Sequence, residues 1–194
     1  DLATLRADPV QGAIDILTPL NAALQLLAQM NAPVIAQVHG AAAGAGLSLV
    51  LMADYVIAAE GTRFNLAYIN LGTSCDVGAS WALPRIVGVR QALEIALLGE
   101  AFTADDALRL GLVNRVVPAA DLDAEVAKVA AQLARSAPHA LRGILDAVIH
   151  GGDMALDQGL EFETQGFAVT VSTEDMHEGT RAFLEKRPAV FKGS

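Results

Sequence analysis

The sequence predicts an α/β fold with parallel strands, followed by a region built of helices alone. Two runs, 34–38 and 55–59, are apolar except for Gln37, as strands are when a parallel sheet is covered on both faces. A glycine-rich turn and a short helix lie between them, and strand, helix and strand within about 25 residues indicate a parallel βαβ unit. From residue 121 onward only helical patterns appear. We therefore expect an α/β core at 1–118 and a helical C-terminal region at 119–194.

Apolar spacing predicts the individual elements. Helices show apolar residues every three or four positions, and the buried strands show continuous apolar runs. Pro33 ends the first helix, and Thr103 with Asp106 three residues on is close to a capping box, which marks a helix start. In chain order we expect a helix at 13–30, a strand at 34–38, a helix at 47–53, a strand at 55–59, helices at 78–86, 90–98 and 103–111, a strand at 112–117, and helices at 121–135, 139–149, 153–171 and 174–186.

Composition excludes several classes of protein. Apolar residues make up 53% of the 194, which is incompatible with intrinsic disorder, and the net charge of −9 argues against binding to nucleic acid or an anionic membrane. The single cysteine, Cys75, excludes a disulfide scaffold and a zinc cluster and indicates a reducing, cytoplasmic setting. No charged residue occurs at 16–53, but acidic flanks and repeated Pro, Asn and Gln mark this stretch as the core of a soluble protein. No signal peptide is visible, and because the chain does not begin with Met we expect it to be processed or incomplete.

The glycine-rich turn is the first candidate site. Gly44-Ala45-Gly46 opens a helix whose first N–H groups lack partners within the helix, so an oxyanion or a phosphate could bind there. The dinucleotide, P-loop and lipase-elbow patterns are all incomplete. Close packing of helix on strand explains the glycines equally well.

Asp76 is the second candidate. It stands in a charge-poor segment ahead of a helix, and a carboxylic acid in apolar surroundings can act as a general base or acid near neutral pH. The alternative is that Asp76 caps the helix. Tyr68 and Ser48 are the other nearby polar groups, and either could be a core hydroxyl.

Several motifs in order resemble the enoyl-CoA hydratase/isomerase (crotonase) family. They are Val38-His-Gly-Ala-Ala-Ala-Gly-Ala-Gly46, Met52-Ala-Asp54, Phe64, Leu83-Pro-Arg-Ile-Val-Gly88, Ala107-x-x-x-Gly111-Leu-Val113 and Glu178-Gly-x-x-Ala-Phe-Leu-Glu-Lys-Arg187. Asp1-Leu2 resembles the end of an upstream family segment, so the chain is similar to the C-terminal three quarters of a member. The resemblance implies a spiral of ββα units and a helical C-terminal trimerisation region. The expected partners are an acyl-CoA thioester and further copies of the chain, as a homotrimer or a dimer of trimers. No cofactor is expected besides the coenzyme A of the substrate.

The resemblance also assigns roles to residues. Ala45 matches the second of two backbone donors that hold the thioester carbonyl, and the first donor would precede Asp1. The two positions that carry glutamate in hydratases are Ser48 and Tyr68 here, whereas Asp76 matches the acidic position of the dienoyl-CoA isomerase branch. We therefore expect double-bond isomerisation with Asp76 as the proton shuttle.

The other site residues follow from the same comparison. Tyr68 would orient the substrate or Asp76, while Gly44 and Ser48 would line the substrate pocket. Phe183 and Lys186 match residues that help to hold the CoA nucleotide of a neighbouring subunit.

Three other functions remain open at this point. Without the two glutamates the chain could bind acyl-CoA without turnover. Asp76 could instead be a nucleophile on an aroyl-CoA, because its position resembles that of the carboxylate in 4-chlorobenzoyl-CoA dehalogenase. A Clp-type serine protease on a related fold would need a histidine near Ser48.

Overall fold

The computed structural model describes residues 8–194, so Asp1 and Leu2 with their resemblance lie outside it. The chain forms two compact units. One holds the first helix and Val34–Ala127, and the other holds Asn31–Pro33 and Lys128–Ser194. The division into domains at residue 118 stays a prediction, because compactness alone does not show which part folds independently.

The first helix, α2 (Pro9–Ala28), begins four residues before its expected start. Asp8 caps it by accepting a hydrogen bond from the Gln11 N–H at 3.1 Å, and Pro9 occupies the first position, where its missing N–H costs nothing. Both signals are visible in the sequence. In this helix Leu24 is buried, whereas Val10 and Leu26 are exposed.

Two three-stranded sheets form the centre of the first unit. The first has the order β1-β3-β6 with parallel pairing throughout, which confirms the predicted βαβ unit. The second has the order β2-β4-β5, in which β2 and β4 are parallel and β4 and β5 antiparallel. The strands are β1 (Ile35–Val38), β2 (Ala41–Ala43), β3 (Tyr55–Ala59), β4 (Arg63–Asn65), β5 (Phe102–Thr103) and β6 (Arg115–Val117).

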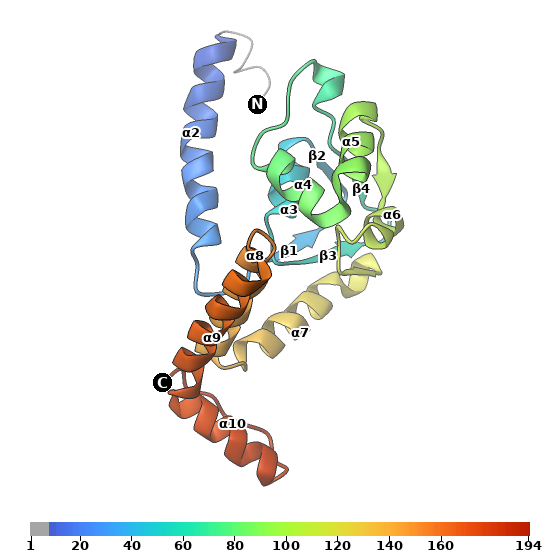
Figure 1. Ribbon diagram of the computed structural model, residues 1–194. Helices are drawn as coiled ribbons and strands as arrows, with labels where there is room; N and C mark the ends of the chain where they lie inside the picture. Colours follow the sequence, from blue (N-terminus) through green and yellow to red (C-terminus); the bar gives the residue numbers. More distant parts are fainter. Residues whose placement is uncertain (1–7) are drawn as a thin grey trace. The chain divides into compact units, whose positions relative to one another are not determined.

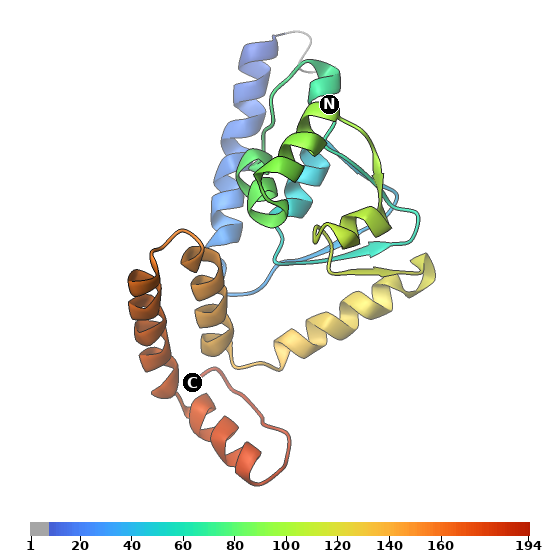
Figure 2. The same ribbon diagram turned by 45° about the vertical axis from the view of Figure 1, so that its right-hand side comes forward.

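Four helices complete the first unit, with the short 3₁₀ turns η1 (Ile69–Leu71) and η2 (Ala119–Asp121). Helix α3 packs against β2 and α4, and α4 packs against α5 (Figures 1 and 2). Phe64 is buried at the centre and stacks on Phe102 with ring centroids 5.8 Å apart. The capping box at Thr103 is confirmed, because its Oγ1 accepts the Asp106 N–H at 3.1 Å. The helices are α3 (Ala45–Leu51), α4 (Ala79–Val87), α5 (Val89–Leu98) and α6 (Ala104–Arg109).

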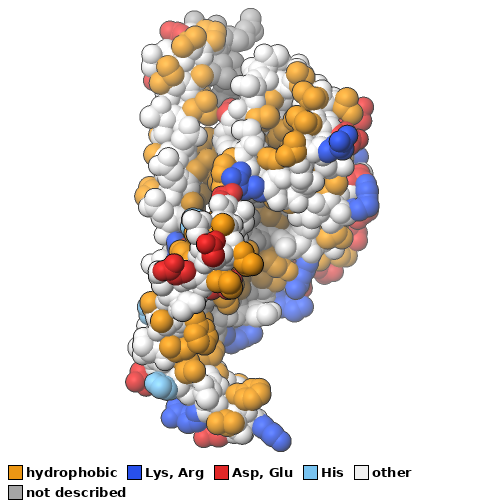
Figure 3. All heavy atoms as spheres, in the orientation of Figure 1, with side chains coloured by type: hydrophobic (Ala, Val, Ile, Leu, Met, Phe, Trp, Pro, Cys, Tyr) orange, Lys and Arg blue, Asp and Glu red, His pale blue; other side chains and the backbone are white. Residues whose placement is uncertain are grey.

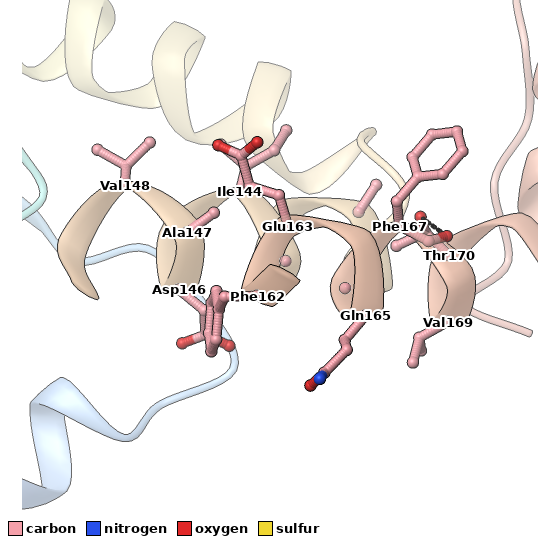
Figure 4. Close-up of a pocket in the computed structure, with 13 residues that line it drawn as sticks. Ile144, Asp146, Ala147, Val148, Phe162, Glu163, Gln165, Phe167, Val169 and Thr170 are labelled. Atoms are coloured by element: carbon pink, nitrogen blue, oxygen red, sulfur yellow. Dashed lines mark hydrogen bonds between the residues drawn. The ribbon is translucent and has the colours of Figure 1, made fainter. Parts of the chain in front are cut away.

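The second unit is helical. It contains the end of helix α7 (Leu122–Ala134) and, in chain order, α8 (Pro138–Gly151), α9 (Leu156–Val171) and α10 (Glu174–Leu184). Helices α8 and α9 pack side by side. A cavity of about 600 Å³ lies between α8 and α9 and is lined mainly by apolar side chains (Figure 4). None of the helices in residues 8–194 is long and apolar enough to cross a membrane.

Candidate active site

The start of α3 presents backbone donors at the surface of the first unit. Gly44 has a φ of 52° and a ψ of −124°, a backbone conformation that residues with a side chain rarely adopt, and its N–H bonds the Asn65 carbonyl at 2.9 Å. The first bond within the helix runs from the Ser48 N–H to the Gly44 carbonyl at 3.0 Å. The N–H groups of Ala45 and Gly46 precede that bond and have no partner within the helix. Both residues are exposed, so a ligand oxygen can reach them.

Three of the expected site residues contact one another directly. Ser48 Oγ lies 2.8 Å from the Tyr68 hydroxyl and 3.2 Å from the Gly44 carbonyl oxygen. The Tyr68 hydroxyl in turn donates to Asp76 Oδ1. We call Ser48, Tyr68 and Asp76 the hydroxyl–carboxylate chain. It joins a carboxylate to the first turn of α3.

The two ends of the hydroxyl–carboxylate chain differ in their exposure to solvent. The Ser48 residue is 0% exposed and Tyr68 is 8% exposed, while Asp76 is half-buried. The two hydroxyl groups are therefore shielded from solvent, and the carboxylate remains accessible to a ligand.

The backbone around Asp76 explains its position. Val77 has a φ of 52° and Gly78 a φ of 79°, so two consecutive residues adopt left-handed conformations. This conformation costs a β-branched residue on the order of 1–3 kcal/mol, and such outliers cluster at functional sites. Gly78 begins α4 without a side-chain cap, so the alternative that Asp76 caps this helix is wrong. The Asp76 side chain contacts Tyr68 instead.

Tyr68 is held by residues that sequence analysis missed. Its carbonyl oxygen accepts hydrogen bonds from the Thr73 N–H at 3.1 Å and from Thr73 Oγ1 at 3.3 Å. Asn65 Oδ1 accepts the Ala67 N–H at 2.7 Å, just before Tyr68. Asn and Thr are common in such local hydrogen bonds, which is the signal that could have identified them.

The neighbours of Asp76 are kept neutral at ordinary pH. Burial, followed by the hydrogen bond to Asp76, raises the pKa of Tyr68 to about 12 because both favour the protonated phenol, and the hydrogen bond to Ser48 opposes them. Burial and the charge of Asp76 also raise the pKa of the Cys75 thiol. In the described part of the chain, no three His, Cys, Asp or Glu side chains are placed to hold a metal ion.

Phe183 and Lys186 lie in the second unit, away in sequence from the hydroxyl–carboxylate chain. The Phe183 side chain, on α10, is 83% exposed. Lys186 is exposed too, adopts a φ of 55° just after the helix, and donates its N–H to the Phe183 carbonyl at 3.2 Å. Their predicted contact with the CoA nucleotide stays a prediction.

Comparison with known proteins places the chain in a family. A family model described as enoyl-CoA hydratase/isomerase matches residues 9–194. The chain is 43% identical over 168 residues to 2,3-dehydroadipyl-CoA hydratase of Escherichia coli, covering 86% of this chain and 66% of that protein. It is 36% identical to crotonyl-CoA hydratase of Syntrophomonas wolfei, over 86% of this chain and 64% of that one. The chain thus spans about two thirds of the length of these curated relatives.

Solved structures agree with the sequence relatives. An enoyl-CoA hydratase from Polaromonas matches with a TM-score of 0.93 and 34% identity, over 98% of this chain and 74% of that one. An enoyl-CoA hydratase from Bacillus anthracis matches with a TM-score of 0.89 and 33% identity, over 96% of this chain and 71% of that one. The protein therefore belongs to the enoyl-CoA hydratase/isomerase family and has its α/β crotonase fold with C-terminal helices.

Proposed function

We propose that the protein in its full length is an acyl-CoA enzyme that moves a carbon–carbon double bond through a thioester enolate. Asp76 removes a proton from the carbon chain next to the polarised thioester and returns it at another carbon. The Ala45 N–H donates to the thioester oxygen, on which negative charge develops. One observation carries the proposal: Tyr68 and Ser48 link the Asp76 carboxylate to the first turn of α3, where Ala45 lies.

The other residues of the site support these two. Tyr68 donates to one oxygen of Asp76 and leaves the second oxygen, Oδ2, to exchange the proton with substrate. Gly44 lets the substrate approach the backbone closely. Ser48 is fully buried and contacts Tyr68 and the Gly44 carbonyl from inside the core, so it supports the site and, contrary to expectation, does not line the substrate pocket. Phe183 and Lys186 bind the CoA nucleotide of a neighbouring subunit, since an exposed aromatic ring and a lysine suit a base and a phosphate.

Hydration is the second candidate, because the relatives described above are named hydratases. Syn addition of water needs one group to activate the water and another to transfer the proton at C2. The family's two glutamate positions are Ser48 and Tyr68 here, and the Tyr68 phenol, with its pKa of about 12, is a poor acid and its phenolate is not populated at neutral pH. Isomerisation needs one proton-transferring group, which Asp76 can supply, and we therefore favour it over hydration.

Isotopes distinguish the candidate reactions. A panel of 2-enoyl-CoA and 3-enoyl-CoA thioesters is incubated with the full-length protein in deuterium oxide and, separately, in ¹⁸O-labelled water. Isomerisation exchanges C–H for deuterium, moves the double bond and incorporates no ¹⁸O, whereas hydration adds ¹⁸O to the acyl chain. Nucleophilic catalysis is tested with a chloroaroyl-CoA in ¹⁸O-labelled water: Asp76 would displace chloride from the ring, and hydrolysis of the resulting ester would place ¹⁸O in Asp76 after a single turnover. Thioester binding without any exchange would show a non-catalytic protein.

Replacing Asp76 tests its role directly. Asp76→Asn keeps the shape of the side chain but removes the base, so we expect turnover to fall by roughly 10²–10⁴-fold with little change in thioester affinity. Steady-state kinetics and equilibrium binding measure the two effects. Asp105→Asn, an exposed change in the first turn of α6, is the matched control and should leave both unchanged. Normal turnover by Asp76→Asn would contradict the assignment.

A further inference from the structure

We propose that Ser48 is a positioning residue that couples the charge of Asp76 to the peptide group between Gly44 and Ala45. The Ser48 hydroxyl has one proton and two acceptors within reach, namely the Tyr68 oxygen at 2.8 Å and the Gly44 carbonyl oxygen at 3.2 Å. If Tyr68 donates its proton to Asp76, the Ser48 hydroxyl can donate to the Tyr68 oxygen. If Tyr68 donates to Ser48, the Ser48 hydroxyl donates to the Gly44 carbonyl. The catalytic consequence rests on the proposed function, in which Ala45 holds the thioester.

Counting protons along the hydroxyl–carboxylate chain gives two states. An ionised Asp76 can only accept, so Tyr68 donates to it and the Tyr68 oxygen is free to accept the Ser48 proton. Once Asp76 has taken a proton from the substrate, it can donate to Tyr68. Tyr68 then donates to Ser48, and Ser48 donates to the Gly44 carbonyl. Because the substrate proton arrives on Oδ2 whereas Tyr68 contacts Oδ1, the change needs a half-turn of the Asp76 carboxylic acid group about its Cβ–Cγ bond as well as rotation of the O–H bonds.

The second state strengthens the backbone donor. The Gly44 carbonyl already accepts the Ser48 N–H at 3.0 Å, and a second hydrogen bond polarises the peptide group further. The N–H of that same peptide belongs to Ala45. The Ala45 donor therefore becomes stronger at the step in which Asp76 gains its proton and the thioester oxygen gains its negative charge.

Neighbouring titratable groups do not change their charge when Asp76 gains or loses its proton. Two titratable side chains that interact with Asp76 are Tyr68 and Cys75, and both have raised pKa values that favour their neutral forms. Asp76 is thus the member of this group whose charge changes during turnover. The effect of that change should be transmitted through Tyr68 and Ser48.

Isotope labelling can observe the Gly44–Ala45 peptide without any substrate. Protein made with [1-¹³C]glycine and [¹⁵N]alanine has directly coupled labels only at Gly–Ala steps. In this sequence these are Gly12–Ala13, Gly40–Ala41, Gly44–Ala45 and Gly78–Ala79. The NMR shifts of the Gly44 carbonyl carbon and the Ala45 N–H report the hydrogen bond to that carbonyl. The peptides at Gly12 and Gly40 serve as internal references.

The Asp76→Asn variant mimics the protonated state, because an amide can donate to Tyr68. We expect it to move the Gly44 carbonyl carbon and the Ala45 proton downfield. The same change should have no such effect in a Ser48→Ala or Tyr68→Phe background, where the connection is broken. Equal shifts in all three backgrounds, or no shift with Asp76→Asn alone, would overturn the proposal.

Kinetics of the full-length protein test the catalytic consequence. Ser48→Ala should lower kcat roughly tenfold and leave KM within about twofold, since the lost interaction acts in the transition state. Ser48→Thr keeps the hydroxyl and should restore most of kcat. Thr62→Val, which removes another fully buried hydroxyl in the same unit, is the control and should retain wild-type kcat. An unchanged kcat in Ser48→Ala would overturn the catalytic consequence.

The NMR experiment and the substrate-exchange experiment test different claims, so one can fail while the other succeeds. If wild-type protein exchanges no substrate proton but the NMR coupling is present, the proposed function is wrong and the coupling stands. If exchange is normal and the coupling is absent, the function stands and the role of Ser48 is wrong.

Discussion

In the proposed reaction, Tyr68 acts without exchanging a proton with the substrate. Its ring is buried, and its hydroxyl contacts Ser48 on one side and Asp76 on the other. Burial penalises the phenolate, and a neighbouring carboxylate penalises it further. Tyr68 therefore remains a hydrogen-bond donor throughout the physiological range, and that it orients Asp76 stays a prediction.

The ionisation of Tyr68 can be measured in isolation. The sequence has two tyrosines, so a Tyr55→Phe variant leaves Tyr68 as its sole phenol. The Tyr68 pKa in the folded protein is about 12, compared with an ordinary value of 10.0. In a pH titration we therefore expect phenolate absorbance to appear about two pH units above the pH at which an ordinary tyrosine ionises. The folded state then holds more protons than the unfolded state between pH 10 and 12, so stability should fall as pH rises through that window.

A second substitution supplies the control for that titration. Adding Asp76→Asn removes the carboxylate that favours the neutral phenol, and the midpoint should move down towards 10. A midpoint that is unaffected by Asp76→Asn would show that burial alone raises the pKa.

Sequence analysis selected Ser48, Tyr68 and Asp76 but could not show that they touch. Ser48 and Tyr68 are 20 residues apart, and their contact depends on β2 pairing with β4, which fixes Gly44 beside Asn65. Pairing register is a tertiary property that local patterns do not carry. Left-handed Val77 was also unpredictable, because a β-branched residue disfavours that conformation.

At the level of elements, length decided what could be predicted. Strand β3 is a continuous apolar run with four buried residues and was predicted. Strand β1 was also predicted, but Gln37 interrupts its apolar run and only Val38 is buried, so the expected burial on both faces is wrong for β1. Strands β2, β4 and β5 have three residues or fewer, too short to show a period, and β2 consists of three alanines inside a glycine-rich run. The long C-terminal helices were predicted from period and caps, with errors of a few residues at their ends.

The end of the chain is attached to α10 by carboxylates. Glu178 pairs with Arg187 and Arg181 and accepts the Val190 N–H at 3.1 Å, and these contacts hold the Glu178 pKa well below its ordinary value. Its stabilising contribution is therefore present above that ordinary value of 4.5 and declines as pH falls below it.

Replacing Glu178 should loosen this segment. With Glu178→Gln at pH 7 we expect amide exchange of Val190 to accelerate by roughly two- to fivefold, the scale of an exposed ion pair. Hydrogen exchange followed by NMR or mass spectrometry measures it. Glu161→Gln, an exposed change on α9, should have no effect on Val190. Exchange that is equally slow in Glu178→Gln would mean that other contacts, such as those of Asp175 with Lys192 and Gly193, hold the segment alone.

At the scale of the molecule, the second unit exposes several large apolar side chains. The side chains of Ile144, Val148 and Phe167 are 65%, 74% and 67% exposed and project from the same side of α8 and α9 (Figure 4). Apolar side chains also emerge over the helical part in the space-filling view (Figure 3). Glu163 projects from the same side next to Ile144, so the face is apolar with one carboxylate in it. Exposed apolar side chains grouped in this way are typical of a protein contact.

We propose that this face, formed by Ile144, Val148 and Phe167, contacts further copies of the chain in the expected homotrimer. Phe167→Glu would place a charge in the contact, so the full-length protein should sediment as a smaller species at micromolar concentration, with its helix content unchanged. Gln165→Glu adds the same charge to the same helix but on the opposite side (Figure 4), and it should leave the sedimentation coefficient unchanged. If both variants sediment like the wild type, this face is not the subunit contact, and the exposed surface must be covered in another way.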